Sequence, residues 1–152
     1  MHKARVLIDA DACPRQALAI VQELCGEYGW NYYTYASFHH QLVGPNHITV
    51  DAGPQAVDTR LANDARAGDI VVTQDIGLAA LILGKKAFAL SPHGMIFDPQ
   101  RIEFHLEERN EKARFRRGGG RTKGPAARTR QDDLRFAEAL RSLLEKARGK
   151  DV

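Results

Sequence analysis

The chain has 152 residues, 27% of them charged, and a formal net charge of +3 at pH 7. This length suits one self-supporting domain. Cys13 and Cys25 form neither a disulfide framework nor a metal-binding pattern, and no run of eighteen apolar residues could span a membrane. The first residues lack the apolar core of a signal peptide. We therefore expect a soluble, cytoplasmic protein without a membrane partner, whose oligomeric state stays open.

Short apolar runs alternate with segments of helical pattern. Strands are predicted at residues 4–8, 30–36, 47–50, 70–73 and 87–90, and helices at 15–28, 54–67, 77–83, 102–111 and 132–148. Neighbouring parallel strands need crossover connections, which are usually helices. The pattern predicts a three-layer α/β fold, with a parallel sheet of about five strands and helices on both faces. An apolar stripe on the last helix is expected to dock on the body: Leu134, Ala137, Leu140, Leu144 and Ala147.

The charge is concentrated late in the chain. Between Arg109 and Arg130 nine Lys and Arg face a single acid, Glu111, so the rest of the chain is acidic. The glycines at 118–120 and Gly124-Pro125 cannot continue a helix cheaply, and we expect a mobile basic loop at 112–130. It is either a solvated tail or a surface for nucleic-acid phosphates. The side chains expected to bind substrate are Arg114, Arg116, Arg117, Arg121 and Lys123.

Carboxylates follow two of the predicted strands. Asp9 and Asp11 come after the first strand and Asp75 after the fourth, whereas Asp58 lies in the first turns of a helix. The carboxyl ends of parallel strands and the N-termini of the following helices share one edge of the sheet. These four acids are therefore expected to converge.

Three other acids are treated differently. Asp64 lies about 9 Å further along the helix than Asp58. Asp69 precedes the fourth strand and so belongs to the opposite edge of the sheet. Asp51 ends the third strand on the correct edge and stays a reserve candidate.

Clustered carboxylates indicate a cation. Two ionised groups about 5 Å apart repel by about 3 kcal/mol at an effective dielectric near 20, and a divalent ion removes this cost. A set of Asp ligands without Cys or His favours Mg²⁺ or Mn²⁺ and hydrolysis of a phosphodiester. The predicted catalytic residues and metal ligands are the same four: Asp9, Asp11, Asp58 and Asp75. Thr73 is expected to orient the Asp75 loop and to contact substrate.

Each feature also has a plainer interpretation. Asp9 could cap a helix and Asp11 could form a turn, and Asp58 could be a solvated helix residue. His39-His40 reads as a polar loop pair rather than a zinc site. Cys13 reads as a small buried side chain, since no His partner is placed by motif.

Two motifs carry a resemblance. Ile8-Asp9-Ala10-Asp11-Ala12-Cys13-Pro14 and the segment 68–79, GDIVVTQDIGLA, resemble the signatures of the YaiI/YqxD family of bacterial proteins. More remotely, the segments 58–62 and 73–78 are similar to the second half of PIN-like nuclease domains. That resemblance implies RNA hydrolysis with Mg²⁺ or Mn²⁺ and matches Asp9 to the first PIN aspartate. PIN domains usually supply a further acid from an intervening helix, and no motif here marks Glu23 or Glu27 as its counterpart.

Three functional hypotheses follow. The first is a metal-dependent phosphodiester hydrolase, a ribonuclease, with RNA as its partner. The second is a nucleic-acid-binding protein that has the acidic edge without catalysis. The third is an aspartate-dependent phosphatase, which ranks last because those enzymes have Thr or Val two residues after the second Asp, where this chain has Cys13.

Overall fold

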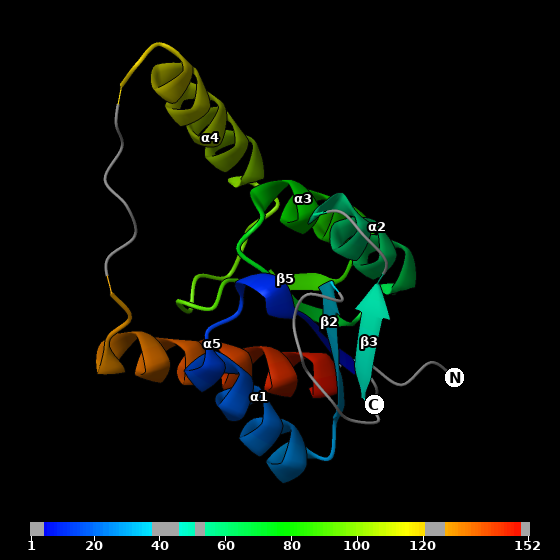
Figure 1. Cartoon of the computed structure of the whole chain (residues 1–152). Coiled ribbons are helices and arrows are strands. Elements are labelled where there is room, and N and C mark those ends of the chain that lie inside the picture. Colours follow the sequence, from blue (N-terminus) through cyan, green and yellow to red (C-terminus); the bar gives the residue numbers. More distant parts are fainter. Residues whose placement is uncertain (1–4, 38–45, 51–53, 121–126, 150–152) are drawn as a thin grey trace.

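The structure, a computed structural model, describes residues 5–37, 46–50, 54–120 and 127–149 (Figure 1). Its strands confirm the predicted alternation, and most element ends differ from the prediction by one to three residues. In chain order the elements are β1 (Arg5–Asp9), the 3-10 turn η1 (Ala10–Ala12), α1 (Arg15–Tyr28), β2 (Asn31–Ser37), β3 (His47–Val50), α2 (Pro54–Asp64), β4 (Ile70–Val72), α3 (Ile76–Gly84), β5 (Phe88–Leu90), α4 (Ile102–Arg117) and α5 (Arg130–Gly149).

The five strands form one parallel sheet in the order β3-β2-β1-β4-β5. The central position of β1 explains its continuous apolar sequence, because Val6, Leu7 and Ile8 are fully buried between helices on both faces. Ile8 is in register with Val72 of β4. The residues that follow β1 and β4 therefore emerge side by side at the carboxyl edge of the sheet.

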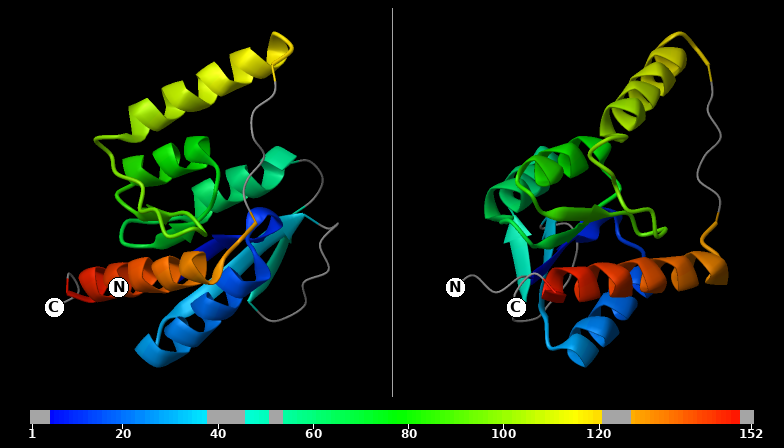
Figure 2. Two further views of the ribbon diagram at one scale, coloured as in Figure 1. Left: turned by 90° about the vertical axis from the view of Figure 1, so that its left-hand side faces the viewer. Right: turned by 180° about the vertical axis from the view of Figure 1, so that it is seen from behind.

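Helices cover both faces of the sheet, as predicted (Figure 2). Helices α1 and α5 pack on one face around Ile8, Val21 and Leu140. Helices α2 and α3 pack on the other around Leu7 and Leu61. No helix in the described part of the chain is long and apolar enough to cross a membrane.

The docking stripe of α5 differs from the prediction at one position. Leu134 is 62% exposed, whereas Phe136 is fully buried with Leu140 and Leu144. At about 100° per residue, Leu134 lies about 120° around the helix from Leu140, while Phe136 lies about 40° away. Phe136 therefore takes the core position expected of Leu134.

The predicted loop at 112–130 is wrong over its first six residues. Helix α4 does not end at residue 111 but continues to Arg117, with Gly118 as its C-cap. No Gly or Pro lies between residues 112 and 117, so the helix runs until the first breaker. Residues 121–126 of the predicted loop lie outside the described part of the chain.

Helices α2 and α3 are joined at their far ends. The ammonium of Lys85, which is the C-cap residue of α3, donates to the carbonyl oxygens of Ala62 and Asn63 in the last turn of α2. A lysine at this position satisfies carbonyls that the helix leaves without partners. The two helices are thus held together at the end opposite to the one where the predicted acids lie.

Candidate functional site

The four predicted acids come from four elements that meet at the carboxyl edge of the sheet. Asp9 is the last residue of β1, Asp11 lies in η1, Asp58 lies in α2, and Asp75 is the N-cap of α3. The strand order places β1 beside β4, and therefore Asp9 beside the turn that carries Asp75. Each acid is held by a separate set of contacts.

Thr73 connects two of these acids. Its hydroxyl donates to the Oδ2 atom of Asp9 over 3.1 Å and accepts from the backbone N–H of Asp75 over 3.0 Å. Thr73 is only 1% exposed. The expected orienting role is what these bonds provide, but a direct contact between Thr73 and substrate does not fit this burial.

Asp75 is fixed as a helix cap and as an acid at once. Its Oδ1 atom accepts from the backbone N–H groups of Gly77, at 2.8 Å, and Leu78, at 3.3 Å. These bonds satisfy donors in the first turn of α3. The same oxygen lies 3.8 Å from the Nη1 atom of Arg109 in α4.

Asp58 reaches the same place from α2. Burial, a hydrogen bond to Asp75 and the negative charges of Asp75, Asp9 and Asp11 raise the pKa of Asp58 to about 7. The ordinary value is 3.8, so the neighbouring acids make a charge on Asp58 costly near neutral pH. Asp58 is therefore part of the cluster and not an isolated surface residue.

Asp9 and Asp11 complete the acidic edge. Burial, together with the charges of Asp11 and Asp75, raises the pKa of Asp9, which is 7% exposed, although the bond from Thr73 opposes this shift. The carboxylate of Asp11 accepts from the backbone N–H of Ser37, at 3.2 and 3.3 Å for its two oxygens. Asp11 is thereby fastened to the end of β2.

The donor set is made of oxygen atoms, which suits a hard cation such as Mg²⁺ or Mn²⁺. Within the described residues, however, no three His, Cys, Asp or Glu side chains are placed to ligate one ion together. The direct contact is between Asp58 and Asp75. This fits Mg²⁺, which is often held by one or two carboxylates and keeps several waters. The predicted grouping of all four acids around one ion is not found in the described part of the chain.

The acids that the sequence argument set aside lie elsewhere. Asp64 accepts from the hydroxyl of Tyr35 at 2.9 Å and pairs with Arg60 at 3.0 Å. Asp69 is buried at the opposite edge, where it pairs with Arg5 at 2.8 Å. Both serve the fold. The reserve candidate Asp51 and the pair His39-His40 lie outside the described residues.

The basic residues divide between two settings. Arg114, Arg116 and Arg117 lie in α4 and not in a loop, and Arg121 and Lys123 lie outside the described residues. A hollow of about 220 Å³ separates α4 from the start of α3, and Arg116 is the one predicted substrate residue that lines it. The lining is Ile76, His105, Glu108, Arg109, Lys112 and Arg116.

Arg109 is the site residue that the sequence argument missed. Arg109 is the first residue of the basic segment. Because the predicted helix ends at residue 111, Arg109 and the later cations were not expected to share one face of a helix. The signal was the spacing of Arg109, Lys112 and Arg116, which puts three cations on one side of a continuous helix.

Thiol chemistry is not supported at this site. Burial raises the pKa of Cys13 to about 12, although the charge of Arg128 opposes the shift, and burial raises that of Cys25 to about 12 as well. A thiol that stays protonated at neutral pH is a poor nucleophile. Cys13 is only partly buried, where the sequence indicated a buried side chain, and it packs against the core as a small apolar group.

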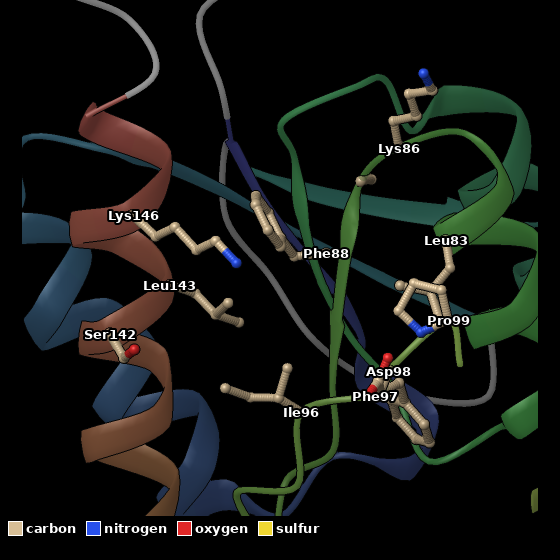
Figure 3. Close-up of a pocket in the computed structure, with 11 residues that line it drawn as sticks. Leu83, Lys86, Phe88, Ile96, Phe97, Asp98, Pro99, Ser142, Leu143 and Lys146 are labelled. Atoms are coloured by element: carbon tan, nitrogen blue, oxygen red, sulfur yellow. The ribbon is translucent and has the colours of Figure 1, made fainter. Parts of the chain in front are cut away.

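A larger cavity of about 690 Å³ lies away from the acids, between α5 and the segment around β5 (Figure 3). In it the ammonium of Lys146 lies 5.5 Å from the centre of the Phe88 ring. None of the four predicted acids lines this cavity. Its lining is Leu83, Lys86, Ala87, Phe88, Ile96, Phe97, Asp98, Pro99, Ser142, Leu143 and Lys146.

Sequence comparison gives the kinship of the chain. The model of the YaiI/YqxD family, described as uncharacterised bacterial proteins, matches residues 7–146. The chain belongs to the YaiI/YqxD family. The resemblance seen in the two sequence motifs is thus confirmed, and the match includes all four acids and helix α4.

Relatives from several bacteria align with almost the whole chain. The UPF0178 protein of Heliobacterium modesticaldum is 48% identical over 145 residues, which is 95% of this chain and 99% of that protein. A UPF0178 protein of Clostridium novyi is 40% identical over 96% of this chain and 98% of its own length. That of Exiguobacterium sibiricum is 41% identical over 92% and 96%. No solved structure matches the chain.

Proposed function

We propose that this protein is a divalent-metal-dependent phosphodiester hydrolase, a cytoplasmic ribonuclease that acts on RNA with Mg²⁺ or Mn²⁺. The observation that carries the proposal is the contact of Asp58 with Asp75 beside Asp9 and Asp11, where burial first, and then these neighbours, raise the pKa of Asp58 to about 7. An arrangement that makes ionisation costly is typical of a site whose ligand is positive. The remote likeness to PIN-like nucleases supports RNA as the substrate.

The chain's own residues would act as follows. Asp58 and Asp75 would hold the ion, with Asp75 oriented by the first turn of α3. Thr73 holds Asp9 in place, and Ser37 holds Asp11. When bound, the ion would supply Lewis-acid polarisation of the phosphate and activation of water. Arg109, next to Asp75, would contribute positive charge toward the substrate.

The phosphatase hypothesis receives less support. An aspartate that attacks phosphorus must present its carboxylate to the substrate. Asp9 is 7% exposed and accepts a hydrogen bond from Thr73. The geometry therefore favours a supporting role for Asp9 in a hydrolytic site.

Two measurements test the proposal. Purified protein should cleave labelled single-stranded RNA in Mn²⁺ and not in EDTA, and Mn²⁺ should raise the melting temperature with concentration. Asp9→Asn, Asp58→Asn and Asp75→Asn should each lose cleavage while keeping the fold. Asp75→Asn and Asp58→Asn should also lose the Mn²⁺ shift in melting temperature.

Asp64→Asn is the matched control. It changes an acid of the same helix as Asp58 that lies outside the cluster, and it leaves an oxygen to accept from Tyr35. It should retain both cleavage and the Mn²⁺ shift. Metal binding without cleavage by the wild-type protein would favour the non-catalytic nucleic-acid-binding protein, and cleavage that survives in Asp75→Asn would overturn the assignment of the site.

A further inference from the structure

Helix α4 stands out from the body of the protein. It projects beyond α3 in each view, at the edge of the layer formed by α2 and α3 (Figures 1 and 2). None of its residues is buried, and Phe104 and Phe115 are 67% and 57% exposed. Only its first turn packs on the body, through Ile102 and through His105, whose ring lies 6.4 Å from that of Phe97.

The charges of α4 are sorted by face. His105, Arg109, Lys112 and Arg116 are spaced four, three and four residues apart, so they follow one stripe along the helix. A second small hollow beside it is lined by Phe104, Glu107, Glu108 and Glu111, and Glu108 lines both hollows. The cationic stripe faces the start of α3, since its members line the hollow there together with Ile76.

This groove continues the acidic site. Arg109 belongs to both the groove and the acidic site, because it lines the groove and its Nη1 atom lies 3.8 Å from Oδ1 of Asp75. Gly77 makes room for it, since a Cβ atom at this position would lie 3.1 Å from that Nη1 atom and 3.2 Å from Oδ1 of Asp75. Of the groove's acids, Glu108 is paired with Lys112 at 3.5 Å. The net charge of the groove stays positive, next to an edge that is negative.

We infer that the groove between α3 and α4 is a phosphate subsite, in which Arg109, Lys112 and Arg116 bind the backbone of the nucleic-acid strand next to the residue held at the acids. This inference rests on the proposed function, whose site it extends. The groove holds about 220 Å³, which is too little for a whole nucleotide chain but suited to a phosphate group at its mouth.

The subsite explains how an acidic edge could receive a polyanion. Four carboxylates repel the substrate's phosphates, and a bound ion offsets part of that charge only locally. A row of cations beginning 3.8 Å from Asp75 gives the neighbouring phosphate an attractive place. Arg is well suited to it, since its guanidinium can donate two parallel hydrogen bonds to phosphate oxygens.

The test compares two double variants that remove the same charge. Arg109→Ala/Lys112→Ala removes two cations of the groove, whereas Arg135→Ala/Arg141→Ala removes two exposed cations of α5, which packs on the other face of the sheet from α2 and α3. Both change the net charge equally. Binding of labelled single-stranded RNA is measured by fluorescence anisotropy in EDTA, where no hydrolysis is expected, over a range of salt concentrations.

The groove variant should bind at least tenfold more weakly, and the slope of log K against log salt should fall by about 1.4, or about 0.7 for each lost phosphate contact. The control variant should change affinity by less than threefold. Equal weakening by both variants would overturn the subsite and indicate a diffuse charge effect. Competition by poly-glutamate as effective as that by RNA would overturn it in favour of an acidic protein partner.

The subsite and the hydrolase can fail separately. If Asp75→Asn still cleaves RNA, or wild-type protein never does, while the groove variant alone loses RNA binding, then the hydrolase proposal fails and the subsite stands. If cleavage needs Asp58 and Asp75 but the groove variant and the control variant bind RNA equally well, the subsite fails and the hydrolase proposal stands.

Discussion

The two edges of the sheet both carry buried acid, but they treat it in opposite ways. At the amino edge, Asp69 is fully buried and accepts from the backbone N–H of Arg5 at 3.0 Å, the guanidinium of Arg5 at 2.8 Å and the backbone N–H of Arg66 at 2.9 Å. At the carboxyl edge, Asp58 and Asp75 lie against each other, and the pKa of Asp58 rises to about 7. At the amino edge, hydrogen-bond donors surround the carboxylate, whereas at the carboxyl edge several carboxyl groups lie together.

This difference separates structural acids from candidate functional acids. Asp69 joins β1 to the turn before β4, so its charge is part of how the fold is held. At the carboxyl edge the neighbouring acids instead raise the cost of ionising Asp9 and Asp58. A cation that binds there would remove this cost. The predictions that follow test this contrast, starting with the largest effect.

Removal of Asp69 should cost the most stability. Asp69→Ala removes the acceptor of two backbone N–H groups and the ionic partner of Arg5, whose guanidinium keeps only the carbonyl oxygen of Asp64, and breaking a buried ion pair from one side typically costs about 3 to 5 kcal/mol. Urea unfolding in EDTA at pH 7 should show a loss of this size. A loss below about 1 kcal/mol would contradict the structural role given to this edge.

Thr73→Val should lower the free energy of unfolding less than Asp69→Ala does, but it should also alter the candidate site. The variant keeps the shape of the side chain and removes the hydroxyl that bridges Asp9 and the N–H of Asp75. Leaving these buried groups without a partner should cost about 1 to 3 kcal/mol. Mn²⁺ affinity, measured by titration calorimetry, should fall about tenfold or more, as for other groups that orient metal ligands. Thr73→Ser should restore most of the affinity, and an unchanged affinity in Thr73→Val would contradict the bridging role.

Asp58→Asn should stabilise the metal-free protein, in contrast to Asp69→Ala. The pKa of Asp58 is about 7 in the folded protein and ordinarily 3.8, so the folded state holds the extra proton between these values. Stability is then greatest below about pH 4, falls as pH rises through this window, and is lowest above about pH 7. Asp9, whose pKa is also raised, adds a loss of the same sign.

The measurement is urea unfolding in EDTA at pH 5 and at pH 8. Because Asp58 is partly exposed, we expect Asp58→Asn to be more stable than wild type by only about 1 kcal/mol at pH 8. The gain should be smaller at pH 5. A variant that is less stable than wild type at pH 8 would show that Asp58 is not under electrostatic strain.

Gly77→Ala should have the smallest effect on stability. It tests whether the position of Arg109 beside Asp75 matters for RNA binding. Alanine is favoured over glycine in a helix by about 0.5 to 1 kcal/mol, and the new Cβ atom would press on the Nη1 atom of Arg109, 3.1 Å away. Thermal unfolding should therefore change little, while RNA affinity in EDTA should fall by a few-fold. Gly26→Ala, in α1, is the control, since nothing lies within 4 Å of its Cβ position. A fall in affinity for both variants would contradict a local effect on Arg109.

Much of the site could be predicted because few topologies fit the pattern. Continuous apolar strands separated by helices require a parallel sheet, and such a sheet sends Asp9, Asp75 and the start of α2 to one edge wherever each strand lies within it. The same reasoning correctly sent Asp69 to the other edge. The position of the third strand was out of reach, and Asp51, which follows it, lies outside the described residues.

The wrong predictions arose where the local sequence does not determine which face of a helix is buried or where a helix ends. Leu134 is predicted in the core because it is apolar, but the buried face of α5 is the one that carries Phe136 and Leu140. The prediction ends helix α4 at residue 111 because it extends the loop expected around Gly118–Gly120 back over the basic residues before it, whereas the helix continues to Arg117. The bridging hydroxyl of Thr73 depends on the register of β1 and β4, Ile8 with Val72, which no pattern within either strand encodes.

Lys85 has a consequence for the placement of the acids. By bonding the carbonyl oxygens of Ala62 and Asn63 from the end of α3, it links the two helices that carry Asp58 and Asp75 about one helical turn beyond Asp58. Sliding of one helix past the other would break these hydrogen bonds. The placement of the two carboxyl groups relative to each other therefore depends in part on a side chain that lies outside the acidic edge.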